Sequence, residues 1–272
     1  PSSGQLSHVA WPDDTRVETW VESGSEVSPF YDPMLAKIIV KADTRDAALR
    51  KLRDALDATE IGGLETNLDY LRQLAASEVL ANGEMLTRTL ATFPYHAQTI
   101  EVLAPGTQTT IQDWPGRTGY WAVGVPPSGP MDHLSFRLAN RLVGNPEGAP
   151  GLELTLSGPT LRFNCDAVVC LAGAGMSAAI GERPVPFWQP VAITAGEVLK
   201  LGSVTGAGAR TYLAVRGGFD VPEYLGSRAT FTLGKFGGHG GRALLPGDVL
   251  HVADPAPESA ASAAEPLAAA LR

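Results

Sequence analysis

Long apolar runs and clusters of basic residues are both missing from this chain of 272 residues. No stretch reaches the roughly 20 consecutive apolar residues that a membrane-spanning helix requires. The net charge is -8 and no basic cluster offsets it, so the charge pattern of a protein that binds nucleic acid or an anionic membrane is absent. The amino terminus, PSSGQLSHVAW, also lacks the basic and apolar regions of a secretory signal. We therefore expect a cytoplasmic protein that binds neither nucleic acid nor membranes.

Cysteine and charge are scarce as well. The only two cysteines, Cys165 and Cys170, lie in an apolar run, and their spacing differs from that of paired zinc ligands. Because nothing else indicates an oxidising compartment, we expect both to be small buried side chains. Charged residues make up 18% of the chain against 44% hydrophobic residues, with 30 glycines and 21 prolines. This mixture favours short strands and many turns over a helical bundle.

Residues 1–91 predict a small α+β unit. Segments 15–22 and 37–41 have the β-branched or alternating residues of strands. Asp43 and Thr44 offer an N-cap for a following helix, which Gly62 and Gly63 are expected to end. A second helical pattern follows the two glycines. The apolar faces of the two helices consist of leucines at helical spacing: Leu49, Leu52 and Leu56, then Leu68, Leu71 and Leu74.

Three runs in residues 1–91 stand out: PSSGQLSHVAWP, RVETWVESGSEVSPFYDPMLAKIIV and TRDAALRKLRDALDATEIGGLETNLDYLRQL. They resemble the C-terminal subdomain of biotin carboxylase, which closes one side of that enzyme's active site. The resemblance implies an arginine close to the reacting bicarbonate and biotin on the strand that matches RVE, and Arg16 has this position. The structural alternative is a surface ion pair of Arg16 with Glu18 or Glu22. Mostly structural roles follow for Tyr31, Asp32, Met34 and Lys37.

Several parts of a complete carboxylase are not visible in the sequence. They are a glycine-rich phosphate loop, a nucleotide-binding lysine, paired carboxylates for magnesium and a biotinyl-lysine segment of the Ala-Met-Lys-Met type. The resemblance implies ATP, magnesium and biotin for the complete enzyme, with biotin on another segment. We expect the chain to be a fragment of a longer polypeptide that binds none of these cofactors alone and is inactive alone in the overall reaction.

From Glu101 onward, strand patterns alternate with turns of glycine, proline and asparagine, which predicts a barrel or a sandwich. Four runs of this region are TIQDWPGRTGYW, GVPPSGPMDHLSFRLANRLVGN, RGGFD and TLGKFGGHGGRAL. They resemble the carboxyltransferase region of urea carboxylase and urea amidolyase, a region known as the KipA-like or allophanate-hydrolase-subunit-2 family. The resemblance implies a cyclophilin-like β-barrel.

The two resemblances divide the chain into four parts. Residues 1–91 are expected to form the biotin carboxylase C-terminal subdomain, and residues 92–100 a linker. Residues 101–254 are expected to form the first half of the carboxyltransferase domain, and residues 255–272 an alanine-rich, low-complexity tail. The expected fold is thus an α+β subdomain followed by a mainly-β, cyclophilin-like barrel domain.

The loop at residues 124–132 runs directly into an amphipathic helical pattern. Asp132 has the N-cap position, and Met131 and Phe136 have the spacing of a hydrophobic staple. The helix is expected to end at Gly144. The structural reading of Asp132 is therefore a helix cap. The functional reading is that the loop amides and the helix amino terminus attract an anion or a polarised oxygen.

The family resemblance implies transfer of a carboxyl group from carboxybiotin to a urea nitrogen, which gives allophanate. Because urea has two amino groups and one carbonyl, its site needs hydrogen-bond acceptors and a donor. Ser128 would present a hydroxyl, Gly129 a backbone amide, and Asp132, the second catalytic candidate, a carboxylate. Further candidates are the acceptors Asp113 and Glu153 and the donors Arg216 and Arg228.

Two glycine-rich segments have both a structural and a functional reading. RGGFD either forms a tight turn or lets Arg216 hold a carboxylate. Residues 232–244 contain five glycines around His239 and either cradle a substrate or form a flexible lid. The P-loop ending GK[ST] is missing from this segment. His239 is a loop histidine or a substrate contact, and it has no second histidine or cysteine at metal-ligand spacing.

Three functions remain open at this point. The first is biotin-dependent carboxylation of urea or a related small amide, with the biotin carrier and the remaining carboxylase domains as partners. The second is a KipA-like subunit of an ATP-dependent 5-oxoprolinase, which the biotin-carboxylase-like leader disfavours. The third is a regulatory binding module that pairs with a KipI-like subunit.

Overall fold

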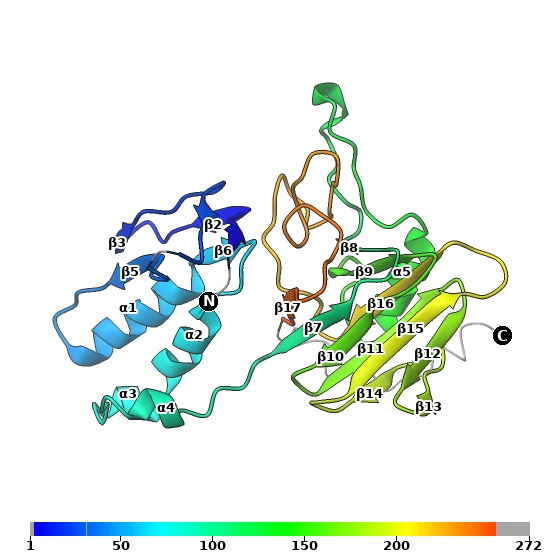
Figure 1. The fold of residues 1–272 in the computed structure, drawn as a ribbon. Coiled ribbons are helices and arrows are strands. Elements are labelled where there is room, and N and C mark those ends of the chain that lie inside the picture. Colours follow the sequence, from blue (N-terminus) through cyan, green and yellow to red (C-terminus); the bar gives the residue numbers. More distant parts are fainter. Residues whose placement is uncertain (1–2, 31, 254–272) are drawn as a thin grey trace. The chain divides into compact units, whose positions relative to one another are not determined.

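The computed structural model of this chain describes residues 3–30 and 32–253. The chain folds as two compact units, unit 1 at Pro1–Ala97 and unit 2 at Gln98–Arg272 (Figure 1). This division falls inside the expected linker at residues 92–100. Among the described residues, every helix is too short or too polar to cross a membrane.

The described part of unit 1 contains three antiparallel pairs of strands. β1 (Gly4–Gln5) pairs with β4 (Glu26–Val27), β2 (His8–Ala10) with β6 (Glu60–Gly62), and β3 (Arg16–Thr19) with β5 (Ala36–Ile39). The pair β3 and β5 confirms the strands expected near residues 15–22 and 37–41. Leu6, Val21 and Val27 form a small apolar cluster beneath these strands.

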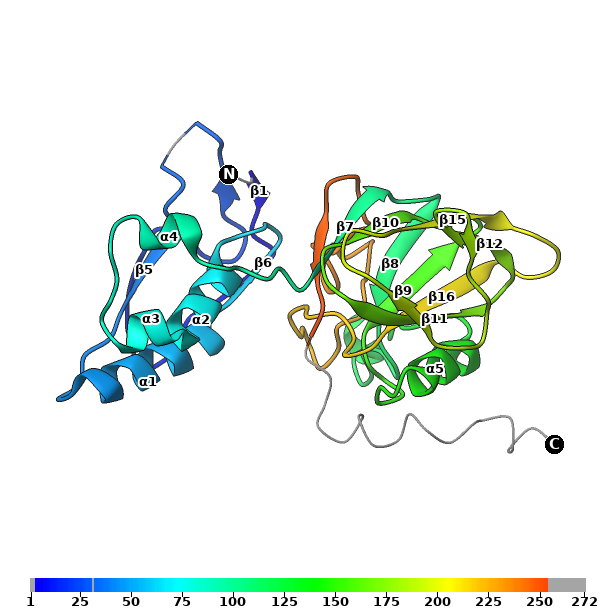
Figure 2. The same ribbon diagram turned by 90° about the horizontal axis from the view of Figure 1, so that it is seen from below.

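Unit 1 also contains the helices α1 (Arg45–Asp57), α2 (Leu68–Ala76), α3 (Glu78–Ala81) and α4 (Thr89–Thr92). The Thr44 hydroxyl caps α1 by accepting a hydrogen bond from the Ala47 amide at 3.2 Å, as the sequence predicts. The predicted end of this helix at Gly62 is wrong, because residues 60–62 pair with β2 as a strand. Helices α1 and α2 lie side by side (Figure 2).

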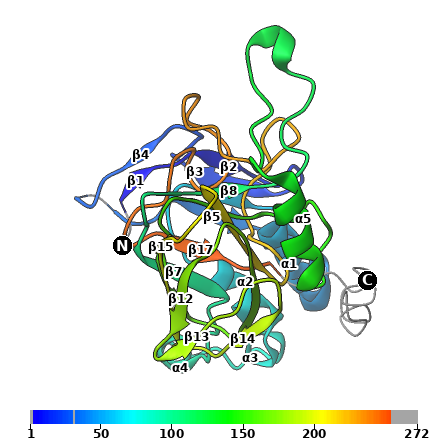
Figure 3. The same ribbon diagram turned by 90° about the vertical axis from the view of Figure 1, so that its right-hand side faces the viewer.

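Unit 2 is built from two antiparallel sheets (Figure 3). The six-stranded sheet has the order β13 (Arg183–Pro184), β12 (Met176–Ile180), β15 (Val198–Val204), β10 (Thr160–Phe163), β7 (Thr99–Ala104) and β17 (Val249–His251). The five-stranded sheet has the order β14 (Val191–Ile193), β11 (Ala167–Gly173), β16 (Arg210–Val215), β9 (Gly151–Thr155) and β8 (Gln108–Gln112). The mainly-β class is confirmed, whereas the described strands form two open sheets and no closed barrel.

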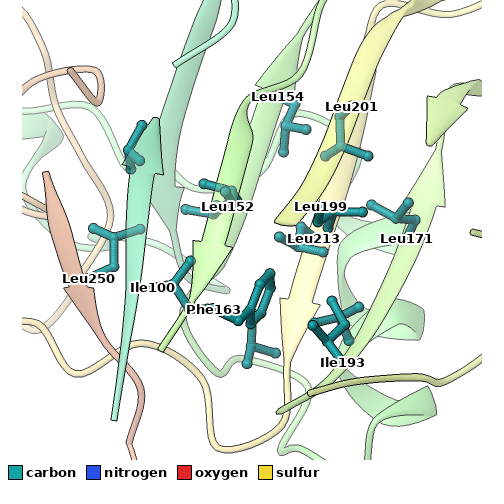
Figure 4. Packing of buried hydrophobic residues seen from close by; sticks show 14 of the residues in the cluster. Ile100, Leu152, Leu154, Phe163, Leu171, Ile193, Leu199, Leu201, Leu213 and Leu250 are labelled. Carbon is teal, nitrogen blue, oxygen red and sulfur yellow. The ribbon is translucent and has the colours of Figure 1, made fainter. Parts of the chain in front are cut away.

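The core of unit 2 lies between these sheets, because alternate residues of each strand point inward. Ile100 and Val102 of β7, for example, belong to the same buried cluster as Leu152 and Leu154 of β9 (Figure 4). The period-two pattern thus places one face of each sheet in a shared apolar interior.

Helix α5 (His133–Leu142) covers the outer face of the five-stranded sheet. Ala139 and Val143 pack against Cys170, Ala172 and Ala214, whose side chains point away from the main core. Both cysteines are buried and free, as the sequence predicts. Burial raises the pKa of the Cys170 thiol to about 12, so its thiolate is scarce at neutral pH.

Candidate functional site

The connection between β8 and α5 forms a long hairpin that projects from the sheets of unit 2 (Figures 1 and 3). Its tip carries a short 3-10 helix, η1 (Trp121–Val123), and Trp121 is 70% exposed. At the base of the hairpin, the Arg117 amide donates to the Pro127 carbonyl at 2.6 Å. The predicted loop at residues 124–132 is therefore the returning arm of this hairpin.

Arg117 fixes the base of the hairpin and is missing from the candidates that the sequence suggests. Its side chain is fully buried. Nε donates to the Tyr224 carbonyl at 2.9 Å, and Nη2 donates to the Ser227 and Ala229 carbonyls at 3.3 and 3.0 Å. The guanidinium also lies 4.8 Å from the centre of the Phe236 ring. Arg117 therefore ties the hairpin to the segment that carries Arg228.

Asp132 is the N-cap of α5. Its carboxylate accepts hydrogen bonds from the Ser135 amide at 3.1 Å and from the Ser135 hydroxyl at 2.5 Å. Burial alone would raise the pKa of this carboxyl, but the hydrogen bonds from Ser135 and Leu134 outweigh it and lower the pKa. Asp132 is thus a carboxylate at neutral pH. The staple expected at Met131 is wrong, because Met131 is 72% exposed and Phe136 packs instead on Tyr212, with ring centres 5.7 Å apart.

Three amides of the loop at residues 124–132 are already paired within unit 2. The Gly129 amide donates to Gln112 Oε1 at 3.0 Å, and the Met131 amide donates to Glu153 Oε2 at 2.7 Å. The Asp132 amide donates to the Tyr212 hydroxyl at 2.7 Å. These contacts determine the shape of the loop and leave fewer amides available for an anion than the sequence suggests.

Glu153 lies beneath the loop rather than on an open surface. Its side chain is 12% exposed, and its carboxylate is 3.5 Å from Arg210 Nε. The Tyr212 hydroxyl donates to Glu153 Oε2 at 3.0 Å. Burial, followed by the nearby Glu153 charge, raises the pKa of Tyr212. The hydrogen-bonding capacity of Glu153 is thus used to hold the loop.

The structure brings the candidates Asp113 and Arg228 together. Asp113 accepts a hydrogen bond from the Ser227 hydroxyl at 2.6 Å and another from the Arg228 amide at 2.8 Å. The Arg228 Nε donates to the Val221 carbonyl at 3.0 Å, and its Nη1 is 3.6 Å from Glu223. Asp113 directly follows β8, so both residues lie near the hairpin base.

Arg216 does not belong to this group. Its Nε donates to the Val143 carbonyl at 3.0 Å, at the carboxyl end of α5. An α-helix rises about 1.5 Å per residue, so Val143 lies about 16 Å from the Asp132 cap along the helix axis. The adjacent Gly217 amide donates to Asn145 Oδ1 at 2.8 Å, which places RGGFD in a hydrogen-bonded turn.

The glycine-rich segment at residues 232–244 is closely packed. Gly237 has a φ of 73°, and a Cβ atom there would lie 2.1 Å from the Ala229 carbonyl oxygen. His239 Nε2 lies 3.5 Å from the Asp248 carboxylate, which also accepts two hydrogen bonds from Arg242 at 2.7 and 2.9 Å. The close packing of the glycines and these polar contacts favour the interpretation of this segment as a tightly packed loop over that of a flexible lid.

Arg16 lies on β3 in unit 1. Its side chain is 70% exposed and forms an ion pair with Glu18. This is the surface pair that the sequence offers as the structural alternative, while a role toward bicarbonate and biotin stays a prediction. Of the neighbouring candidates, Tyr31 lies outside the described residues.

Comparison with known protein families shows to which family the chain belongs. The family described as "Carboxyltransferase domain, subdomain A and B" matches residues 123–271, more than half of the chain. This chain belongs to that family. The family described as "Biotin carboxylase C-terminal domain" matches residues 1–92. The two resemblances that the sequence motifs suggest, to biotin carboxylase in the first part of the chain and to a carboxyltransferase region in the second, are thereby confirmed.

Individual relatives of this carboxyltransferase-family chain fall into two groups. Urea amidolyase of Saccharomyces cerevisiae is 48% identical over 250 residues, which are 92% of this chain and 14% of that protein. The crystal structure of Kluyveromyces lactis urea carboxylase has a TM-score of 0.87 and 49% identity, and the match covers 94% of this chain and 22% of that one. A 5-oxoprolinase subunit of Escherichia coli is 39% identical over 153 residues, 56% of this chain and 49% of that protein. The chain thus spans about 14% of the length of the urea amidolyase.

Proposed function

We propose that this chain is part of a biotin-dependent urea carboxylase, which uses ATP and bicarbonate to convert urea to allophanate. The observation that supports this proposal most strongly is the order of the two family matches. A biotin carboxylase C-terminal domain precedes a carboxyltransferase domain in one chain. The chain is 48% identical to a urea amidolyase over 92% of the chain's own length. We also propose that the two sheets of unit 2 represent the cyclophilin-like architecture.

The acceptor site that we propose lies at the base of the hairpin, around the end of β8. Asp113 and Arg228 are joined there by a hydrogen bond, and Gln112 holds the Gly129 amide. Arg228 keeps part of its guanidinium accessible, with 42% of its side chain exposed, and can donate to the oxygen of urea. Ser128 adds a hydroxyl from the loop.

Bound carboxybiotin supplies the carboxyl group of the proposed reaction. The residues of this chain bind and orient the acceptor amide. Asp132 is suited to accept a hydrogen bond from an N–H group, because its lowered pKa keeps it ionised. The same low pKa makes it a weak base, so we assign it orientation of the attacking nitrogen rather than proton removal. Substrate contacts by His239 and Arg216 remain predictions, and the Arg216 side chain donates to the carboxyl end of α5, the end opposite the Asp132 cap.

Biotin, ATP and magnesium are proposed to act through other segments of the complete enzyme. The described residues contain no group of three or more acidic, histidine or cysteine side chains that suits a metal ion. The partners that we propose are the biotin carrier and the remaining carboxylase domains. In unit 1, Arg16 is the proposed contact to the carboxylation site.

The proposal is tested by measuring bicarbonate-dependent ATP cleavage by the complete polypeptide, with urea and with competing amides. We expect urea to stimulate ATP cleavage and allophanate to accumulate. A lack of stimulation by urea in a biotinylated, folded enzyme would reject the proposal. Cleavage that depends on 5-oxoproline instead would favour the 5-oxoprolinase alternative.

The 5-oxoprolinase alternative rests on a match to little more than half of the chain. The match to the Escherichia coli protein covers 56% of this chain, whereas the biotin carboxylase match adds residues 1–92. A biotin carboxylase domain serves a carboxylation reaction, so its presence favours the urea carboxylase proposal over the 5-oxoprolinase alternative. The regulatory alternative would be favoured if a KipI-like protein co-purified with a polypeptide that shows no urea-dependent turnover.

A further inference from the structure

The strand pair β3 and β5 carries three charged side chains on one face. The register of the two strands places Glu18 directly opposite Lys37, and Arg16 lies two residues before Glu18 on the same strand. Because side chains alternate along a strand, all three point to the same side. Arg16, Glu18 and Lys37 are exposed, whereas Val17 and Ile38, which point to the opposite side, are partly buried. Two cations and one carboxylate therefore share a single patch of surface.

The Glu18 carboxylate is paired with Arg16 and not with Lys37. Arg16 Nη2 contacts Glu18 Oε1. Lys37 forms no ion pair with any residue that the structure describes, although the Cβ atoms of directly opposite residues lie only about 4.5–5.5 Å apart. The residue opposite Arg16 is Ile39, which offers no charged group. Arg16 and Lys37 thus compete for one carboxylate.

Competition for Glu18 determines how often the Arg16 guanidinium is free to bind another anion. The Arg16 side chain is 70% exposed, and exposed ion pairs are weak, so Arg16 exchanges between Glu18 and other anions. A carboxylate and bicarbonate use the same guanidinium donors. The apparent affinity for a ligand falls in proportion to the fraction of molecules in the binding-competent state. A cation that holds Glu18 in place of Arg16 therefore strengthens bicarbonate binding.

We propose that Lys37 is a positioning residue for biotin carboxylation, which takes over the Glu18 carboxylate when Arg16 turns to bicarbonate. This inference rests on the proposed function, in which Arg16 contacts the carboxylation site. It goes beyond the mostly structural role that the family resemblance implies for Lys37. Opposite charges on directly facing strand residues attract, and an ammonium group on a flexible four-carbon stem follows the carboxylate as it moves. Lys37 acts through Glu18 and Arg16 and does not touch bicarbonate itself.

Transfer of radiolabelled bicarbonate to the biotin of the complete enzyme, measured in a single turnover without urea, tests the inference. Lys37→Met should raise the half-saturating bicarbonate concentration about two- to fivefold, with the maximal rate and the melting temperature unchanged. Lys41→Met is the matched control, because Lys41 is also exposed and follows β5, so that the same charge is lost nearby. Lys37→Arg keeps a cation opposite Glu18 and should retain the wild-type value.

A second substitution distinguishes this exchange from a structural role of Lys37. In a Glu18→Gln background, Lys37→Met should no longer change the half-saturating concentration, because a neutral side chain does not hold Arg16. Equal values for Lys37→Met and Lys41→Met would overturn the inference, and so would an increase that persists with Glu18→Gln. The expected bicarbonate dependence without urea-stimulated ATP cleavage would reject the urea assignment and keep the role of Lys37.

Discussion

The Tyr212 hydroxyl joins the Glu153 carboxylate to the start of helix α5. It accepts a hydrogen bond from the Asp132 amide at 2.7 Å and donates one to Glu153 Oε2 at 3.0 Å. Glu153 Oε2 also accepts from the Met131 amide at 2.7 Å. Strands β9 and β16 therefore set the position of the hairpin's returning arm. Any chemistry at this loop therefore depends on Tyr212 and Glu153, which lie far from the loop in the sequence.

We predict that Tyr212→Phe lowers both stability and carboxyl transfer. The variant keeps the ring but leaves the Asp132 amide unpaired and removes a donor from Glu153, which typically costs about 1–3 kcal/mol. Guanidinium unfolding of the complete enzyme and the rate of allophanate formation measure the two effects. Tyr224→Phe is the control, because Tyr224 is 45% exposed. Equal behaviour of the two variants would contradict a role for the Tyr212 hydroxyl.

Substitution of Asp132 distinguishes its role as a helix cap from its proposed role in orienting the substrate. Asp132→Asn keeps an oxygen that can accept from the Ser135 amide but removes the charge, so carboxyl transfer should fall more than the melting temperature. Ser135→Ala is the matched control, because it removes the hydroxyl that donates to Asp132 and leaves the carboxylate in place. Proportional losses of rate and stability in both variants would reduce Asp132 to a helix cap.

Arg16→Ala should abolish biotin carboxylation in the complete enzyme while the fold is kept. An exposed ion pair contributes about 0–1 kcal/mol, so loss of the contact with Glu18 has little effect on stability. Glu18→Gln removes the same ion pair but leaves the arginine, and it should therefore retain most of the activity. Unchanged bicarbonate-dependent ATP cleavage in Arg16→Ala would refute the catalytic role and leave only the surface pair.

Local features of the fold follow from the sequence because they depend on neighbours along the chain. The caps Thr44 and Asp132 and the buried cysteines are of this kind. Arg117 is different, because its acceptors lie 107 to 112 residues away and its surroundings read as an ordinary glycine-rich loop. The same holds for Tyr212, whose contact with Asp132 spans 80 residues. Pairing between distant strands decides which candidates meet, and local sequence patterns do not show which strands pair.

The ion pair of Asp248 with Arg242 should make stability depend on pH. Burial would raise the pKa of Asp248, but hydrogen bonds from Arg242, His239 and the Leu245 amide lower it well below its usual value. Because the folded pKa is below the unfolded value of about 4, the stabilisation is complete above pH 4 and is lost as the pH falls further. Asp248→Asn should therefore be less stable at pH 7 by about 2 kcal/mol. Guanidinium unfolding at pH 7 and pH 3 should show this difference shrink in acid, and a constant difference would contradict the prediction.

Substitution of a glycine in residues 232–244 tests whether this segment is a tightly packed loop or a flexible lid. Gly237→Ala would place a Cβ atom 2.1 Å from the Ala229 carbonyl oxygen, at a φ of 73°. Gly247→Ala is the matched control, since it has a φ of 88° but no heavy atom within 4 Å of the added Cβ. Both variants carry backbone strain of about 1–2 kcal/mol, and only Gly237→Ala adds a clash with fixed backbone. We expect Gly237→Ala to lower the melting temperature clearly more than the control. Equal shifts would show that the segment moves aside and acts as a lid.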